Sequence, residues 1–451
     1  MKHLAKRVAA GLLAVLMSVL LCLPASAAGI LYEFPADEGT PIESPSALMM
    51  YMGVKSEQDV ILYEKAADTR YQPGALMRVA MLGYAMKQIR AQHLNIDTVT
   101  AAYSLELFNH YVAGTGLHVA LMNFGEEWTL RDLLTVSTLQ TAADCAVTLA
   151  TAIAGSPEAF VEGLNGFAQE LGCTNSHFTN VVGLNEDGQY MSARDVMTFT
   201  RYAMQYAEVE KMLELTQYTV TPVSGGKTRS WPTSNDMQRA STPFFYTYSA
   251  GGKTGGTLTE MSVMEYGSKD GYEYMAVVMG APRKDEKGEM TGVAYADARR
   301  LIRWGFLDFS YEMLARKGEP AGRLRVTDSA SADTIALVPT DNFYTVVNSK
   351  VDITAITRRV VTEKQSLAAP IKAGEPMGTL ELYYDDQLIG SVPLETGEDV
   401  PYHFLYSVWS RVSAVLFSGW TVAILVLIGA LVAGYVVFNI RYNRKRNKKW
   451  R

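Results

Sequence analysis

The segment GGKTGGT, residues 251–257, places one lysine between pairs of glycines. Glycines on both sides of an ammonium group allow a charged ligand to come close to the backbone. A phosphate-binding P-loop also needs a glycine five positions before Gly252, and Thr247 stands there instead. The pattern therefore predicts a charged ligand close to Lys253 and argues against a nucleotide phosphate.

Long stretches of the chain resemble the serine-type D-alanyl-D-alanine carboxypeptidases, which are low-molecular-mass penicillin-binding proteins of bacteria. The similarity is carried by GGKTGGT, by AVVMGAPRKDE (276–286), by FVEGLNGFAQELGCTNSHFTNVVGLNEDGQYMSARDVM (160–197) and by PIKAGEPMGTLELYYDDQLIGSVPLETGEDV (370–400). The resemblance implies removal of the last D-alanine of peptidoglycan stem peptides through an acyl-enzyme. It also implies three motifs. In S-x-x-K the lysine activates the serine, S-x-N relays a proton and holds the substrate backbone, and K-T-G takes the terminal carboxylate.

Matched position by position, the chain keeps only the third motif. Ala75 and Arg78 stand where S-x-x-K should have its serine and lysine. Thr141, Ala142 and Ala143 replace S-x-N, whereas Lys253-Thr254-Gly255 is intact. A methyl group cannot attack a carbonyl, and a guanidinium with a pKa above about 12 cannot act as a base near neutral pH. Loss of a serine nucleophile typically costs on the order of 10⁶ in turnover, so we predict a catalytically inactive member of the family.

Substrate binding does not need the lost nucleophile. The resemblance assigns it to Lys253, Thr254, Gly255 and Thr257, and backbone N–H groups at Ala75 and Thr257 are expected to remain as donors. The expected ligand is a peptidoglycan stem peptide or its D-alanine terminus. The leading hypothesis is a membrane-anchored binding or scaffolding protein of the cell envelope, whose protein partner is unknown.

A relocated nucleophile would instead give an active carboxypeptidase. Ser224 and Lys227 form a literal S-x-x-K, but the two glycines between them deny this segment a helix. The hydroxyl of Ser137, one turn before Thr141, fits a bond inside its own helix better than a catalytic role. Thr141 has no lysine partner on the helix of Ala75, because Lys87 lies three turns too far along. A third hypothesis is a purely structural interaction protein.

No cofactor and no metal are predicted. The six histidines include no pair at ligand spacing within a helix, and His110 and His118 fit surface or core positions better. Asp195 matches a segment of the family, but helix capping explains it as well. Cys145 and Cys173 are too few for a disulfide framework and are expected to be free, buried thiols.

The resemblance implies an α+β fold of the penicillin-binding and serine β-lactamase type, an antiparallel sheet with helices on both faces, over residues 28–312. The sequence pattern agrees with it. Apolar segments 47–54 and 59–65 predict a strand hairpin, and 261–267 and 272–282 predict further strands. Helices are predicted over 73–89, 129–155, 191–213 and 293–306, the second and third opening on the capping pairs Thr129/Asp132 and Ser192/Asp195. Alternating segments predict a small all-β domain over 323–401.

The two ends of the chain indicate export and membrane anchoring. Residues 1–27 have the basic start, apolar run and Ala-Ser-Ala of a signal peptide. Residues 402–419 form an aromatic juxtamembrane segment, 420–440 are long and apolar enough to cross a bilayer, and 441–451 carry seven Lys/Arg and no acid. The positive-inside rule predicts a single-pass plasma-membrane protein with its large part outside and its basic tail in the cytoplasm. Subtracting the +3 of the leader and the +7 of the tail from −6 leaves −16 for residues 28–440, which excludes nucleic acid as an expected partner.

Overall fold

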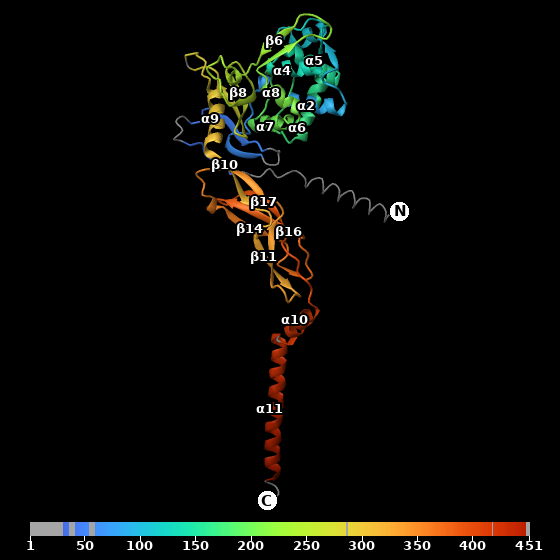
Figure 1. Cartoon of the computed structure of the whole chain (residues 1–451), viewed down its shortest axis with the longest axis vertical. Coiled ribbons are helices and arrows are strands. Elements are labelled where there is room, and N and C mark those ends of the chain that lie inside the picture. The colour runs from blue at the N-terminus through green and yellow to red at the C-terminus, as the bar shows by residue number, and fades with distance from the viewer. Residues whose placement is uncertain (1–29, 36–40, 54–58, 286, 417, 448–451) are drawn as a thin grey trace, which may run out of the picture. The chain divides into compact units, whose positions relative to one another are not determined.

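The computed structural model describes residues 30–35, 41–53, 59–285, 287–416 and 418–447. It divides into two compact units (Figure 1). The first holds the chain up to Glu312 together with Thr345–Ala355 and Gln387–Ile389, and the second holds the rest. The predicted signal peptide, residues 1–27, lies outside the described residues.

The first unit is built on a five-stranded antiparallel sheet, in the order β2-β1-β9-β8-β7. The predicted hairpin is confirmed, because β1 pairs with β2. GGKTGGT lies in and just after β7, which is the edge strand. The bounds are β1 Ser46–Tyr51, β2 Val60–Lys65, β7 Ser249–Gly256, β8 Glu260–Lys269 and β9 Tyr272–Pro282.

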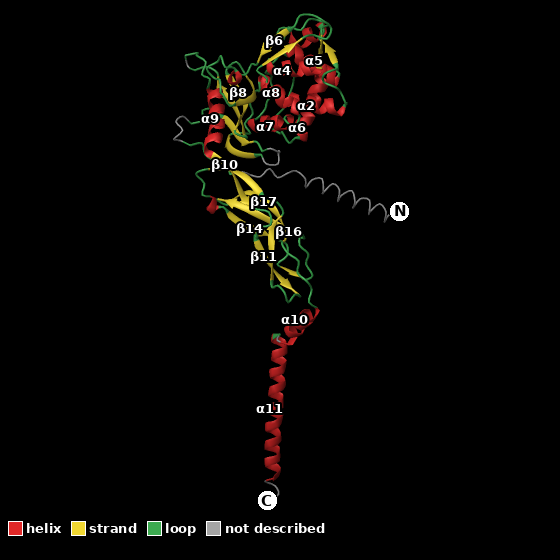
Figure 2. Ribbon diagram, viewed as in Figure 1, coloured by secondary structure: helices red, strands yellow, loops and turns green. Residues whose placement is uncertain are grey.

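Alternating strand residues bury both faces of this sheet. On β9, Met275, Val277 and Met279 join the core shared with the helical layer, whereas Tyr274, Ala276 and Val278 join the core shared with α9 (Val293–Asp308). A period of two along a strand sends neighbouring side chains to opposite faces. The predicted α+β architecture, a sheet with helices on both faces, is therefore confirmed (Figure 2).

The helical layer differs from the prediction in where its helices break. The predicted helix over 73–89 begins as a 3₁₀ turn, η3 (Gly74–Met77), and continues as α2 (Arg78–Ala91). The predicted helix over 129–155 is two helices, α4 (Leu130–Leu139) and α5 (Ala143–Ala154). Thr141 has a φ of 61°, a left-handed conformation that a helix does not allow, so the chain turns there.

A second break lies between α7 (Ala193–Ala203) and α8 (Ala207–Glu214), which were predicted as one helix. The capping box Thr129/Asp132 is present as predicted. At Ser192 only half of the box forms, because the Asp195 carboxylate accepts from the Asn175 N–H (2.9 Å) and the Ser176 hydroxyl (2.8 Å). Asp195 therefore ties a loop to the helix as well as beginning it.

Shorter elements complete the first unit. They are β3 Thr100–Ala102, α3 Leu105–Leu107, η4 Phe108–Val112, β4 Glu127–Thr129, α6 Pro157–Glu170, β5 Gln217–Val220, β6 Arg229–Pro232 and η5 Asp236–Gln238. Strand β10 (Phe309–Ala315) follows α9 and pairs with β13 (Phe343–Asn348). Cys145 and Cys173 are buried, unpaired thiols.

The second unit contains a six-stranded sheet in the order β14-β16-β17-β12-β11-β15, which agrees with the predicted β-domain. The bounds of its strands are β11 Gly322–Thr327, β12 Thr334–Pro339, β14 Thr357–Val361, β15 Ser366–Ala368, β16 Pro376–Tyr384 and β17 Gln387–Thr396. The short η6, Ile353–Ala355, belongs to the first unit. Two helices follow, α10 (Phe404–Leu416) and α11 (Gly419–Asn447). Residues Gly419–Tyr442 of α11 form a candidate membrane span with a mean hydropathy of 2.6.

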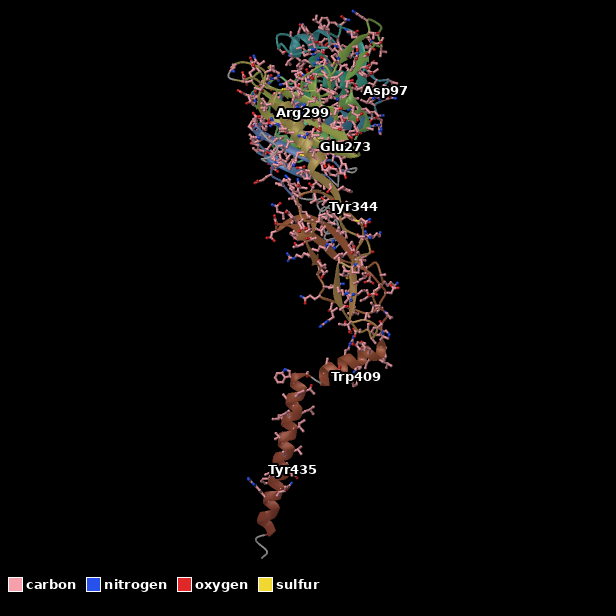
Figure 3. The ribbon with its side chains drawn as sticks, turned by 60° about the vertical axis from the view of Figure 1, so that its left-hand side comes forward. Asp97, Glu273, Arg299, Tyr344, Trp409 and Tyr435 are labelled. Atoms are coloured by element: carbon pink, nitrogen blue, oxygen red, sulfur yellow. The ribbon has the colours of Figure 1, made fainter. Side chains whose placement is uncertain are left out.

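Helix α10 is bound to the β-domain through one carboxylate. The Ser407 hydroxyl donates to Asp328 Oδ1 (2.6 Å), and Arg411 lies 3.6 Å from Asp328 Oδ2. Its large apolar side chains are mostly exposed, and Trp409 projects from the helix, as Tyr435 does from α11 (Figure 3). Helix α10 lies within residues 402–419, for which the sequence predicts an aromatic juxtamembrane segment.

Candidate functional site

A cleft of about 670 Å³ opens beside the edge strand β7 in the first unit. Its walls come from η3, from the loop between η4 and β4, from the break at Thr141 between α4 and α5, from a loop after α6 and from the end of β7. The lining residues are Gly74, Ala75, Thr115, Gly116, Leu117, His118, Thr141, Val182, Gly183, Leu184, Asn185, Ser234, Asp236, Thr254, Gly255, Gly256, Thr257, Leu258, Met261, Arg283 and Tyr295.

The predicted site residues fall into two groups. The first group lines this cleft, although its first and last members are 182 residues apart in the chain; it consists of Ala75, Thr141, Thr254, Gly255 and Thr257. Arg78, Ala143 and Lys253 do not line it and are at most 2% exposed. The structure thus brings all three motif positions together, with the second group buried beneath the wall.

Ala75 faces the cleft where the resemblance expects the serine. Its turn is held tightly against β7, because the Gly256 N–H donates to the Pro73 carbonyl at 2.9 Å. A Cβ on Gly255 would lie 2.3 Å from the backbone N of Leu76 and the carbonyl O of Pro73. No larger residue than glycine fits there without moving η3 away from β7.

The glycines around Lys253 are therefore explained by packing inside the protein. A Cβ on Gly251 would lie 2.5 Å from the ring of Tyr266, and one on Gly252 would lie 2.2 Å from Glu265 Oε2. The sequence suggested that these glycines serve a ligand. In the structure Gly255 packs against the turn η3, Gly251 against the ring of Tyr266 and Gly252 against the carboxylate of Glu265.

Asn185 joins the two sides of this junction. Its Oδ1 accepts from the Gly74 N–H (3.0 Å), and its Nδ2 donates to the Gly256 carbonyl (3.0 Å). It therefore positions η3 and β7 relative to each other. Sequence reasoning did not select Asn185, although it lies within the stretch 160–197 that carries the family resemblance.

The predicted oxyanion donor at Thr257 is already in use. Its N–H donates to the Glu260 carbonyl at 2.9 Å, and its hydroxyl accepts from the N–H groups of Thr259 and Glu260. The expectation that this N–H is free for a ligand is wrong for this structure. The reason is the tight turn between β7 and β8, which uses it internally.

Arg78 is fully buried, and its guanidinium is bonded inside the protein and does not line the cleft. Its guanidinium donates to the carbonyls of Val181 and Val182, the second at 2.9 Å, and to the sulfur of Met81 at 2.9 Å. Burial lowers its pKa to about 10, so it stays charged near neutral pH. Arg78 thus supports the cleft wall at Val182 and cannot accept a proton from a nucleophile.

The S-x-N region keeps its shape by backbone contacts. The Ala143 N–H donates to the His118 carbonyl (2.8 Å). The buried Asp144 carboxylate accepts from the N–H groups of Ala120 (2.9 Å) and Met122 (3.1 Å), which fixes the loop that brings His118 to the cleft. Ser137, one turn before the break, donates to the Leu134 carbonyl (3.0 Å), as expected for a helix-satisfied hydroxyl.

Lys253 is 2% exposed, and its ammonium has no hydrogen-bond partner among the described residues. Burial, helped by the positive charge of Arg78, lowers its pKa to about 7. On the neighbouring strand β8, Glu265 accepts from the Ser249 hydroxyl and from Asn235 Nδ2 (2.7 Å), and burial raises its pKa to about 8. The adjacent strands β7 and β8 therefore carry one buried ionisable group each, Lys253 and Glu265, with pKa values near neutral pH.

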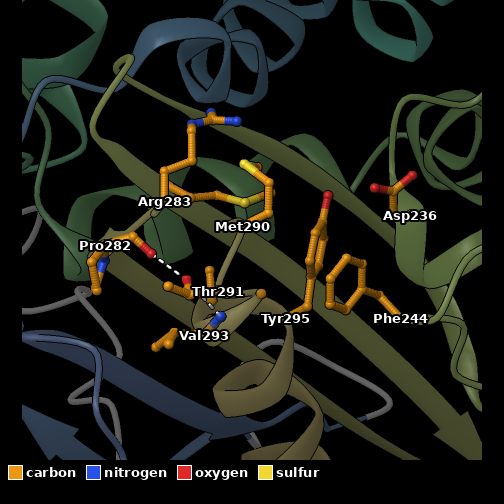
Figure 4. A pocket seen from close by; sticks show the side chains of 11 residues that line it. Asp236, Phe244, Pro282, Arg283, Met290, Thr291, Val293 and Tyr295 are labelled. Atoms are coloured by element: carbon orange, nitrogen blue, oxygen red, sulfur yellow. Dashed lines mark hydrogen bonds between the residues drawn. The ribbon is translucent and has the colours of Figure 1, made fainter. Parts of the chain in front are cut away.

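A recess of about 90 Å³ extends the cleft, sharing Asp236, Met261, Arg283 and Tyr295 with it. Figure 4 shows Phe244 stacked beside Tyr295, with ring centroids 4.8 Å apart, and Arg283 on the other side of Tyr295. The Arg283 Nε donates to the Thr257 carbonyl at 3.0 Å. Arg283 lies within AVVMGAPRKDE, one of the stretches that carry the family resemblance, but the sequence analysis did not predict it as a site residue.

Comparison with protein families gives two matches. The model for D-alanyl-D-alanine carboxypeptidase (Peptidase S11) matches residues 37–283, and the model for the penicillin-binding protein 5 C-terminal domain matches residues 309–402. The first covers more than half of the chain and every lining residue of the cleft except Tyr295.

Similar proteins agree with these matches. The D-alanyl-D-alanine carboxypeptidase DacF of Bacillus subtilis is 22% identical over 359 residues, 79% of this chain and 86% of DacF. DacD of Escherichia coli is 28% identical over 289 residues, 63% of this chain and 69% of DacD. Among solved structures, DacD from Francisella tularensis superposes with a TM-score of 0.63 at 19% identity, covering 81% of this chain and 95% of its own. Penicillin-binding protein 5 from Haemophilus influenzae superposes with a TM-score of 0.62 at 21% identity, covering 80% and 98%.

Proposed function

Since the chain belongs to the D-alanyl-D-alanine carboxypeptidase family, we propose that it binds the D-alanine end of peptidoglycan stem peptides without cleaving it. The observation that carries this proposal is Ala75 at the cleft wall, with the guanidinium of Arg78 held by the Val181 and Val182 carbonyls. A serine hydrolase needs a nucleophile and an adjacent base. Neither position supplies one.

The cleft retains features suited to an extended peptide. Strand β7 is the edge of its sheet, so a peptide can lie beside it and pair with its backbone. Thr254 and Thr257 place hydroxyls on the same wall, and Arg283 adds a guanidinium, the side chain best matched to a carboxylate. Lys253 is buried behind this wall and acts on a peptide carboxylate through its charge.

Two binding experiments test the proposal. A fluorescent penicillin should leave the purified full chain unlabelled, because acylation needs a nucleophile. A peptide ending in D-Ala-D-Ala should bind, and Arg283→Met should weaken it about 10-fold or more through loss of a charge-assisted hydrogen bond. The surface variant Lys227→Met serves as the control. Covalent labelling would establish an active enzyme with a relocated nucleophile, and absence of peptide binding would favour a structural interaction protein.

The same proposal includes the division of the chain into segments. They are the carboxypeptidase-like domain (28–312), the β-domain (323–401), the juxtamembrane segment (402–419), the membrane span (420–440) and the basic tail (441–451). The candidate span in α11 and the apolar surface of α10 support anchoring of the protein in the plasma membrane. We place the cleft outside the cell, where peptidoglycan is, and the basic tail in the cytoplasm. A protein partner in the cell envelope would then bind differently to the protein with a peptide in its cleft and to the protein with an empty cleft.

A further inference from the structure

The recess beside the cleft places two opposite charges in one small cavity. It has a volume of about 90 Å³, and Arg283 and Asp236 both line it. Figure 4 shows these two side chains on opposite sides of Tyr295. Among the described residues they form no ion pair with each other, because Asp236 pairs with Arg239 (3.1 Å) and Arg283 contacts no carboxylate. A ligand that carries both charges can therefore approach the two groups together.

Each charged group keeps hydrogen-bonding capacity for a ligand. Arg283 Nε donates to the Thr257 carbonyl (3.0 Å), and its two terminal nitrogens have no partner in the part of the chain that the structure describes. Asp236 Oδ1 accepts from Arg239 Nη1 (3.1 Å), and no described donor reaches Oδ2. A guanidinium matches a carboxylate in geometry, and a carboxylate oxygen accepts from an ammonium. The free atoms thus suit a carboxylate on one side and an ammonium on the other.

The rest of the recess is mainly apolar. Phe244 and Tyr295 stack with their ring centroids 4.8 Å apart, and Met261, Val293 and Ala294 line the recess beside them. An apolar side chain that leaves water for such surroundings gains free energy in proportion to the area buried. The recess therefore combines a site for two opposite charges with a site for a short apolar group.

The recess is preformed, because hydrogen bonds fix its rim. The Thr291 hydroxyl donates to the Pro282 carbonyl (2.5 Å), and the Thr291 N–H donates to the Arg283 carbonyl (3.1 Å). A Cβ on Gly292 would lie 2.2 Å from the ring of Phe244, so this ring packs directly on the backbone. One water needs about 10–15 Å³ of cavity volume, so the recess has room for roughly six to nine non-hydrogen atoms. Alanine stands at the lower end of this range and leucine at the upper end.

We propose that the recess binds one free α-amino acid in its zwitterionic form, with a side chain in the size range from alanine to leucine. The carboxylate pairs with the terminal nitrogens of Arg283, the ammonium donates to Asp236 Oδ2, and the side chain packs against the two stacked rings. The K-T-G residues 253–255 do not line the recess, so the site is separate from that motif and does not depend on the proposed peptide binding. Because Arg283 lines both the recess and the cleft, a bound amino acid would compete with a peptide carboxylate for its guanidinium.

Isothermal titration calorimetry of the full chain in detergent tests the site, with D-alanine, L-alanine, D-leucine and L-leucine as probes. At least one of the four should bind with a dissociation constant of about 1 mM or lower. Propionate and isopropylamine each carry only one of the two charges and should bind at least about 10-fold more weakly, because one charge-assisted contact is lost. Tryptophan should not bind, because it is too large for the recess.

Variants of the two charged residues assign the binding to the recess. Arg283→Met and Asp236→Asn should each weaken it about 10-fold or more, and both residues are partly exposed, so we expect the variants to fold. The controls Lys227→Met and Asp187→Asn change exposed residues that do not line the recess and should bind as the wild type does.

Three results would overturn the amino-acid site. They are no binding of any of the four amino acids, binding of propionate as tight as theirs, and wild-type affinity in Asp236→Asn. Titration with the D-Ala-D-Ala peptide is a separate measurement. Amino-acid binding without peptide binding would overturn the proposed function and leave this site in place.

Discussion

Arg78 has a structural role at a position where the family resemblance expects a catalytic lysine. A lysine in its place would have one mobile ammonium, whereas the planar guanidinium reaches two successive carbonyls and a sulfur at once. Its charge stays fixed near neutral pH, so it cannot alternate between base and acid. The residue that should activate a nucleophile instead holds the wall at Val182.

The double variant Ala75→Ser with Arg78→Lys is therefore not expected to regain full activity while Ala143 remains. Lysine loses the paired carbonyl contacts, and Ala143 still provides no amide for the substrate. Loss of one such hydrogen-bonding group commonly lowers turnover by about 100-fold or more. D-alanine release from a D-Ala-D-Ala peptide should stay at least that far below an intact family member assayed in parallel. Turnover equal to that relative would mean that the second motif is dispensable here.

Glu265 should make the protein less stable as the pH rises. Its pKa is raised from 4.5 to about 8 by burial, so the native state keeps a proton that the unfolded chain releases near pH 4.5. The stabilisation is full below pH 4.5 and is lost as the pH rises to 8, by up to about 3 kcal/mol at pH 7. Lys253, with a lowered pKa near 7, acts in the opposite sense above pH 7.

Unfolding midpoints measured between pH 5 and 7 isolate the effect of Glu265. Glu265→Gln should remove most of the fall across this range, because glutamine keeps the shape without the charge. The exposed Glu289→Gln should leave the fall unchanged. An equal fall in wild type and Glu265→Gln would show that another group is responsible.

Among the secondary-structure elements, the contact between η3 and β7 decides the shape of the cleft. The Gly256 N–H to Pro73 carbonyl bond and the two bonds of Asn185 join a helix start to a sheet edge. The break at Thr141 shapes the opposite wall of the cleft, because an uninterrupted helix from α4 to α5 would carry Thr141 away from the cleft. These junctions use backbone groups and the side-chain amide of Asn185, so they persist where the catalytic side chains are missing.

Gly255→Ala tests the first junction. The new methyl would meet the backbone of Pro73 and Leu76 at 2.3 Å, and backbone cannot rotate aside. We expect a loss of about 3 kcal/mol or more in unfolding free energy, measured by urea unfolding, together with weaker peptide binding. Gly166→Ala, in the interior of α6 with nothing within 4 Å, should be neutral or slightly stabilising. Similar stability of Gly255→Ala and the wild type would mean that η3 can move freely from β7.

In the whole molecule, charge and hydropathy distinguish the acidic main part of the chain from the candidate membrane span and the basic tail. Residues 28–440 carry −16, whereas residues 441–451 carry +7. The apolar side chains of α11 are exposed along its length, which is stable only in a lipid environment or against a partner. These features support α11 as a membrane anchor.

The pair of substitutions Leu427→Arg and Leu431→Arg should weaken this anchoring. Each arginine near the centre of a membrane helix costs about 2.5–3.5 kcal/mol on insertion scales. Carbonate extraction of membranes should release the variant but retain the wild type and Leu307→Arg, whose exposed leucine lies in α9. Retention of the double arginine variant would argue against α11 as a membrane span.

The family, the strand hairpin, the two-sided sheet, the β-domain and the absence of a serine at position 75 could all be predicted from the amino-acid sequence. These follow from residue identity and local periodicity, which the chain displays without folding. The folded structure was needed to show that the glycines of GGKTGGT pack against internal neighbours, that the Thr257 N–H is already bonded, and that Arg78 and Lys253 are both buried. Such facts depend on which atoms meet across long separations in the chain, and burial and hydrogen-bond occupancy do not exist until those atoms have met.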